Sequence, residues 1–125
     1  MTRVTCHCGA VELRVTLKEP VSNARRCDCS FCAKRGPAVV FVGAGDLEIV
    51  QGEKDLTLYQ WNTGQEEHFF CSHCGIYTHH QHADPREGYA VNLGAIEGVN
   101  PADHDPMPWL DGRNYQPADF SKVRS

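Results

Sequence analysis

Two short cysteine pairs lie far apart in the sequence, and each is followed directly by glycine. They are Cys6-His7-Cys8-Gly9 and Cys71-Ser72-His73-Cys74-Gly75. Glycine adopts a positive φ at little steric cost, so the chain after each pair can turn tightly and point its N–H groups at the sulfurs. Two such turns brought together would surround one ion with four thiolates, which is the closed arrangement of a structural zinc. We therefore expect a structural zinc on Cys6, Cys8, Cys71 and Cys74.

The other three cysteines lie within one short segment, Cys27-Asp28-Cys29-Ser30-Phe31-Cys32. Thiolates this close repel one another, and a zinc ion among them would relieve the repulsion. Three protein ligands leave one tetrahedral position open, which is typical of catalytic zinc. Zinc readily binds a thiolate and deprotonates a thiol near neutral pH, so we expect a small thiol there as an activated nucleophile, in preference to water. The predicted catalytic zinc ligands are Cys27, Cys29 and Cys32, giving two zinc ions per chain.

Two other interpretations of this second cluster remain open. A histidine could close it as another structural zinc, and the available residues are His68, His73, His79, His80 and His82. A redox switch or an iron–sulfur cluster is less favoured, because no fourth cysteine remains once the two pairs are used. The nearby basic residues would offset the negative charge of the cluster; they are Arg25, Arg26, Lys34 and Arg35.

A histidine-rich run, Tyr77 to His82, invites a further hypothesis. On a strand, His80 and His82 would share one face and His79 would point to the other. Any of the three could carry protons near the second zinc, since histidine titrates close to physiological pH. The more ordinary interpretation is a polar strand face or its hydrogen-bonded edge.

Length and charge restrict the class of protein. A chain of 125 residues with a net charge of −4 predicts one small domain over residues 1–125. No long basic run is present, which argues against nucleic acid or an anionic membrane as the main partner. No stretch of about 18 apolar residues is present either. The odd number of cysteines fits disulfides poorly and favours a reducing compartment, so we expect a cytoplasmic protein.

The hydrophobic pattern predicts a mainly β fold with little helix. Apolar residues alternate with polar ones, or form short runs, between glycines and other turn residues. The expected strands cover residues 11–17, 38–42, 47–50, 56–61, 66–70, 76–81 and 89–93. Helix is expected only as one turn at Ser30 to Lys34 and a short segment beginning near Pro101. From about residue 95, repeated prolines predict an irregular C-terminal arm.

The three cysteine motifs, in this order and spacing, resemble the glutathione-dependent formaldehyde-activating enzyme family, which includes the centromere protein V relatives. The resemblance continues through Gly75-Ile76-Tyr77-Thr78-His79-His80, Asn92-Leu93-Gly94 and Glu97-Gly98-Val99-Asn100-Pro101. It implies a β-tent fold, related to zinc ribbons. It also implies a structural zinc on the four paired cysteines and a second zinc, on the Cys27–Cys32 segment, that meets the glutathione sulfur.

The activity implied by this resemblance joins glutathione and formaldehyde into S-hydroxymethylglutathione, formally a carbon–sulfur lyase reaction in reverse. The expected partners are therefore a small, glutathione-like thiol and an aldehyde. The alternative from another class is a non-catalytic, zinc-structured binding module, and a thiol redox sensor is a third hypothesis.

Overall fold

The described residues form two β-sheets, a small one of three strands and a long one of seven strands. The computed structural model describes residues 1–17, 21, 23–61 and 64–112. The small sheet has the order β1-β2-β5, and its strands are β1 (Thr2–Thr5), β2 (Glu12–Val15) and β5 (Leu47–Gln51). The long sheet has the order β10-β3-β4-β9-β8-β7-β6. Its strands are β3 (Arg25–Cys27), β4 (Ala38–Val42), β6 (Leu56–Tyr59), β7 (Glu67–Cys71), β8 (Tyr77–Gln81), β9 (Tyr89–Asn92) and β10 (Trp109–Leu110).

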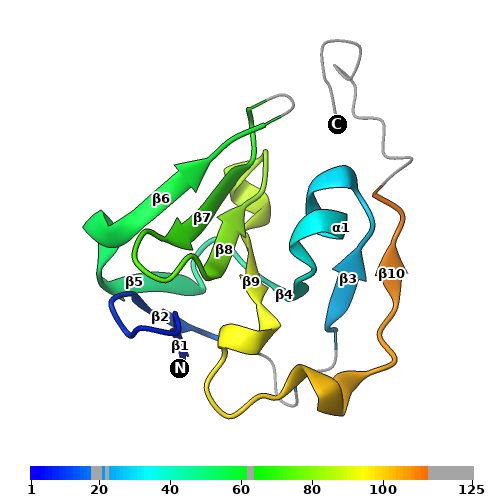
Figure 1. Cartoon of the computed structure of the whole chain (residues 1–125), viewed down its shortest axis with the longest axis horizontal. Helices are drawn as coiled ribbons and strands as arrows, with labels where there is room; N and C mark the ends of the chain where they lie inside the picture. Colours follow the sequence, from blue (N-terminus) through cyan, green and yellow to red (C-terminus); the bar gives the residue numbers. More distant parts are fainter. Residues whose placement is uncertain (18–20, 22, 62–63, 113–125) are drawn as a thin grey trace.

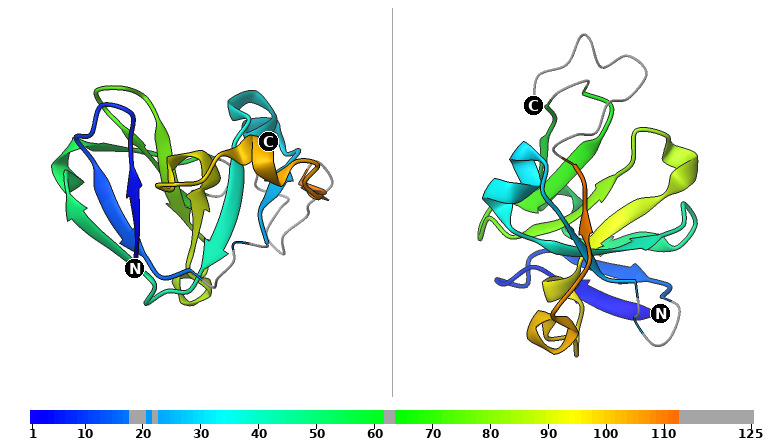
Figure 2. Two further views of the ribbon diagram at one scale, coloured as in Figure 1. Left: turned by 90° about the horizontal axis from the view of Figure 1, so that it is seen from below. Right: turned by 90° about the vertical axis from the view of Figure 1, so that its right-hand side faces the viewer.

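Neighbouring strands are antiparallel throughout, except that β10 runs parallel to β3. The single α-helix among the described residues, α1 (Ser30–Arg35), lies beside β3 (Figure 1). Short 3₁₀ helices are η1 (Glu53–Asp55), η2 (Pro85–Glu87), η3 (Leu93–Ala95) and η4 (Pro101–His104). The small sheet lies toward one end of the molecule, and α1 lies toward the other end with β3 and β10, the last strands of the long sheet (Figure 2).

One core joins the two sheets. Leu13 and Val15 of the small sheet are fully buried. So are Val40 and Val91 of the long sheet, and Leu93, which directly follows β9. Burying a side chain of this size stabilises the fold by roughly 1.5–3 kcal/mol. The alternation of residues 11–17 predicted the inward face of β2 correctly, since Leu13 and Val15 point into this core.

The opposite face of the long sheet is turned toward α1. Paired positions on five neighbouring strands lie in one row across this face, and they are Tyr59, His68, His80, Ala90 and Phe41. Phe31 of α1 contacts this row, with its ring centroid 5.2 Å from Tyr59 and 4.7 Å from His68. This covered face therefore carries the imidazoles of His68 and His80 beside the aromatic ring of Phe31.

The mainly β fold predicted from the sequence is confirmed, and so are the helical turn at α1 and the short helix at Pro101. The N-terminus of α1 is capped by Cys29, whose sulfur accepts from the N–H of Cys32 at 3.3 Å. Three strands were not expected, namely β1, β3 and β10. The sequence of β3 is Arg25-Arg26-Cys27, which lacks the alternation that marks a strand. Across the described residues no helix is long and apolar enough to span a membrane.

Gly52 stands where the chain leaves the small sheet and permits a close approach of two backbone segments. Its φ is +81°, and a Cβ atom there would lie 2.1 Å from the carbonyl oxygen of Ala10. We expect Gly52→Ala to lower the free energy of unfolding by at least about 2 kcal/mol, because it adds both a clash and an unfavourable φ. Gly45→Ala is the control, since its Cβ meets nothing within 4 Å. Urea unfolding of both variants tests this, and equal midpoints would contradict it.

Candidate metal centres and the adjoining pocket

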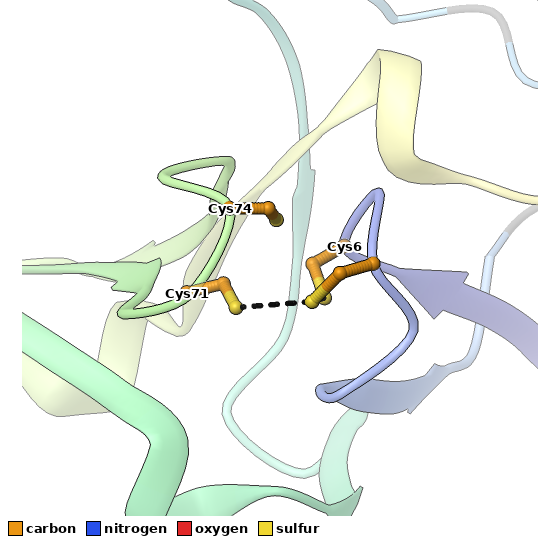
Figure 3. Close-up of side chains that lie close together, drawn as sticks. Cys6, Cys71 and Cys74 are labelled. Atoms are coloured by element: carbon orange, nitrogen blue, oxygen red, sulfur yellow. Dashed lines mark hydrogen bonds between the residues drawn. The ribbon is translucent and has the colours of Figure 1, made fainter.

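The four paired cysteines converge at one point between the two sheets. Cys6 and Cys8 come from the turn between β1 and β2, and Cys71 and Cys74 from the turn between β7 and β8 (Figure 3). All four sulfurs lie within 4.8 Å of one another. The sulfur of Cys8 lies 3.6 Å from that of Cys6 and 3.7 Å from that of Cys71. A tetrahedral zinc with Zn–S bonds of about 2.3 Å holds its sulfurs about 3.8 Å apart, so this donor set fits the ion.

The two turns have the backbone geometry predicted from their glycines. Gly9 and Gly75 have φ values of +84° and +76°. The N–H of Val11 donates to the sulfur of Cys6 at 3.3 Å, and the N–H of His73 donates to that of Cys71 at 3.4 Å. Burial opposes ionisation of Cys6, but the hydrogen bond from Val11 and the neighbouring thiols lower its pKa overall. Each turn is therefore arranged to hold thiolate sulfur.

The second turn is also tied to η1 next to it. The N–H of Ser72 donates to the carbonyl of Asp55 at 2.8 Å, and the His73 imidazole pairs with the Asp55 carboxylate at 2.9 Å. These contacts give His73 a role in positioning this turn. His73 is not among the described residues that gather at the three-cysteine cluster.

The second cluster forms where β3 meets α1. Cys27 ends β3, Cys29 caps α1, and Cys32 lies in the first turn of the helix. Their three sulfurs lie within 4.8 Å of one another. The mutual hydrogen bonds of the thiols lower the pKa of Cys29 and raise that of Cys32. Three thiolates this close together would concentrate negative charge, which a bound divalent cation would neutralise.

Gly112 covers this cluster from the C-terminal arm, a role that the sequence did not reveal. A Cβ atom on Gly112 would lie 2.4 Å from the sulfur of Cys27 and 2.8 Å from the Cβ of Cys29. Its N–H donates to the carboxylate of Asp28 at 2.8 Å. The arm, held by the pairing of β10 with β3, thus contacts the three-cysteine segment through Gly112, which has no side chain.

Arg35 is the basic residue that the fold directs at the cluster. Its guanidinium lies between two rings, 4.1 Å from the centroid of Phe31 and 3.7 Å from that of Tyr77. One of its nitrogens, Nη2, is 3.8 Å from the sulfur of Cys32. Arg26 instead donates to the carbonyl of Gly36 at 3.2 Å.

The described residues add no histidine to the three-cysteine cluster. The alternation predicted for the histidine run is confirmed: the rings of His80 and His82 are 5.5 Å apart on one face, while His79 stacks on Phe69 at 4.8 Å on the other. His80 and His82 lie on a polar strand face, in keeping with the more ordinary interpretation of this run, although the strand is not at a sheet edge. β8 lies between β7 and β9, and His79 and His80 are buried.

A pocket of about 610 Å³ lies between α1 and the covered face of the long sheet. This size suits a small organic ligand. Its lining includes Arg26, Phe31, Arg35, Tyr59, His68 and Asn92. Among the described residues no cysteine lines the pocket, but Arg26 and Phe31 are the chain neighbours of Cys27 and Cys32, and Arg35 lies near the Cys32 sulfur. Sequence reasoning gave neither Tyr59 nor Asn92 a role in a pocket, although Asn92 belongs to one of the motifs that carry the family resemblance. The two residues come from separate strands, which only the sheet order brings together.

A family model for the glutathione-dependent formaldehyde-activating enzyme matches residues 1–109. This chain belongs to that family. A protein of Halomonas elongata named "Putative glutathione-dependent formaldehyde-activating enzyme" is 37% identical over 78 residues, which cover 56% of this chain and 49% of the relative. The chain therefore spans about half the length of that curated relative. A crystal structure of a Rhodobacter sphaeroides protein has a TM-score of 0.81 and 50% identity, over 86% of this chain and 99% of the other.

For this family member, we expect Cys71→Ser to abolish cooperative folding. Structural zinc contributes roughly 10–16 kcal/mol of apparent binding energy in small peptides, which is comparable to the whole stability of a domain. Cys32→Ser is the matched control, because its cluster lies outside the core. We expect that variant to retain a cooperative transition and to lose one zinc per chain. Calorimetry with metal analysis tests this, and a Cys71→Ser protein with unchanged zinc content and melting temperature would refute it.

Gly112→Ala tests the close approach of the arm. The added methyl group would collide with Cys27, so we expect the variant to bind about one zinc fewer per chain while still unfolding cooperatively. Gly45→Ala again serves as control and should keep its full zinc content. Metal analysis after gel filtration measures the difference. Equal zinc content in the two variants would mean that the arm moves aside without cost.

Proposed function

We propose that this chain is a zinc enzyme of carbon–sulfur bond chemistry, acting on glutathione or a similar thiol and on formaldehyde or a similar aldehyde. The product would be S-hydroxymethylglutathione, and the class a carbon–sulfur lyase written in reverse. One observation carries the proposal. Cys27, Cys29 and Cys32 form a set of three sulfurs, and their neighbours Arg26, Phe31 and Arg35 line a pocket, while the other four cysteines already make a complete set elsewhere.

A zinc ion bound by these three cysteines would supply a free coordination position that accepts a thiol sulfur and lowers its pKa. The chain itself would position the reactants. In the reaction, the thiolate sulfur attacks the carbonyl carbon and a C–S bond forms. The electron pair of the carbonyl π bond moves to oxygen, which takes a proton from water, while the thiol proton is released to solvent.

The pocket offers groups that suit an anionic thiol. Glutathione carries two carboxylates and one ammonium group near neutral pH, and guanidinium groups pair well with carboxylates. Arg26 and Arg35 both line the pocket, with Phe31 and Tyr59 as its apolar wall. Arg35 is held between two rings, so it would lose little conformational freedom when a substrate binds.

The cytoplasmic location, the single domain over residues 1–125 and the absence of a nucleic-acid partner stay predictions. The exposure of Cys8 and the partial exposure of Cys27, Cys29 and Cys32 are compatible with a reducing compartment, in which thiols persist.

Cobalt substitution tests the open position. We expect glutathione to shift the thiolate-to-cobalt absorption of the Co²⁺ protein, because a fourth sulfur joins the coordination shell. S-methylglutathione should leave the spectrum unchanged, since its sulfur cannot ionise. Cys32→Ser should lose the response to glutathione. The parent protein should accelerate the formation of S-hydroxymethylglutathione, and exchange NMR measures that rate.

An unchanged spectrum with glutathione would contradict the proposed enzyme and favour a non-catalytic zinc module. A spectral change with glutathione and with S-methylglutathione alike would mean binding without thiolate coordination. That result would also contradict the proposed mechanism.

A further inference from the structure

Glu66, His68, His80 and His82 form a compact array on the hairpin of β7 and β8. His68 pairs directly with His80 in the antiparallel register. Glu66 and His82 come directly beyond the ends of these two strands, and the N–H of His82 donates to the carbonyl of Gly88 at 3.1 Å. The rings of His80 and His82 are 5.5 Å apart, and a carboxylate oxygen of Glu66 is 3.8 Å from Nε2 of His68, so the four side chains gather at one place.

Three of these side chains bring ligand atoms close together. One carboxylate oxygen of Glu66 and one ring nitrogen each of His80 and His82 lie within 4.8 Å of one another. We propose that Glu66, His80 and His82 bind a divalent transition-metal ion, at a site separate from the two cysteine clusters. Two imidazoles and one carboxylate suit Zn²⁺, Co²⁺ or Ni²⁺. Ca²⁺ and Mg²⁺ prefer a shell of oxygen atoms.

The buried ligand is already oriented for this role. The hydroxyl of Tyr77 lies 2.7 Å from Nδ1 of His80. Metal-binding histidines usually bond an oxygen through their other ring nitrogen, which fixes the tautomer and the ring. With Nδ1 engaged by Tyr77, the Nε2 atom of His80 is the one available to an ion.

His68 supplies an independent observation at the same place. Its side chain is almost fully buried, and within the described structure neither ring nitrogen has a hydrogen-bond partner. Buried polar groups are normally paired, and exceptions call for an explanation. Nε2 of His68 is 3.8 Å from a carboxylate oxygen of Glu66, and the rings of His68 and His80 are 4.6 Å apart. An ion held by Glu66 would lie within reach of this unpartnered imidazole.

Access to the site is open from one side. The Glu66 side chain is 44% exposed and His82 is half-buried, whereas His80 and His68 are covered. An ion could therefore enter past Glu66 and His82. His68, next to the proposed ligands, also contacts the helix of the second cluster, since its ring lies 4.7 Å from that of Phe31.

Cobalt titration of the zinc-loaded protein tests the proposal. The protein is first dialysed against citrate, so that zinc remains only where cysteines hold it. We expect calorimetry to show one equivalent of Co²⁺ binding. Its spectrum should contain visible d–d bands without new thiolate-to-cobalt absorption. No binding, or binding accompanied by sulfur charge transfer, would overturn the proposal.

Two accessible ligands provide variants that should fold normally. We expect Glu66→Gln and His82→Gln each to weaken Co²⁺ binding at least about tenfold. His104→Gln, a histidine outside the array, is the matched control and should bind as the parent does. Cys32→Ser should also keep the Co²⁺ site, which separates this proposal from the proposed enzyme function. Unchanged affinity in both ligand variants, or equal weakening in His104→Gln, would overturn the assignment.

Discussion

The central constraint on the fold is the meeting of four cysteine sulfurs from distant parts of the chain, which we propose to be held together by one metal ion. The turn at Cys6 and Cys8 belongs to the small sheet, and the turn at Cys71 and Cys74 belongs to the long one. Cys6 and Cys71 are buried, where unpaired thiolates would be costly. An ion here would close a loop of more than sixty residues and fasten the two sheets at the edge of their common core. In a domain this small, that contribution is of the same order as the net stability, roughly 5–15 kcal/mol.

The hairpin of β7 and β8 then positions most of the remaining chemistry. One end of this hairpin supplies Cys71 and Cys74, while the open end of the same two strands supplies Glu66 and His82. Between these ends, the covered face carries His68 against Phe31 of α1. The proposed structural ion thus fixes the register that places a histidine array beside the helix of the second cluster. A change at the structural site would therefore be transmitted to the pocket through the two strands that join them.

The cysteine groups were predictable because the residues that define each of them are close together in the sequence. A glycine directly after each pair marks a turn that can present N–H groups to sulfur, and the distance between the pairs in sequence does not weaken that signal. The strands with alternating or continuous apolar residues were predictable for the same reason. β3 was not, because Arg25-Arg26-Cys27 owes its extended form to pairing with β4 and β10. The roles of Gly112 and His68 were also hidden, since each depends on which distant segment lies opposite.

The charge of the second cluster explains why Arg35 would contribute more to the proposed reaction than the neighbouring Lys34. Three thiolates around a dication would leave one net negative charge, and a bound substrate thiolate would add another. A substrate that is itself an anion would be repelled unless a cation lay close by. Lys34 is exposed, whereas Arg35 is clamped between Phe31 and Tyr77 with a guanidinium nitrogen near the sulfur of Cys32. A guanidinium keeps its proton in such surroundings, where a buried ammonium would tend to lose its own. The aromatic clamp therefore suits arginine specifically, and it keeps positive charge at the one point where the proposed reaction would accumulate negative charge.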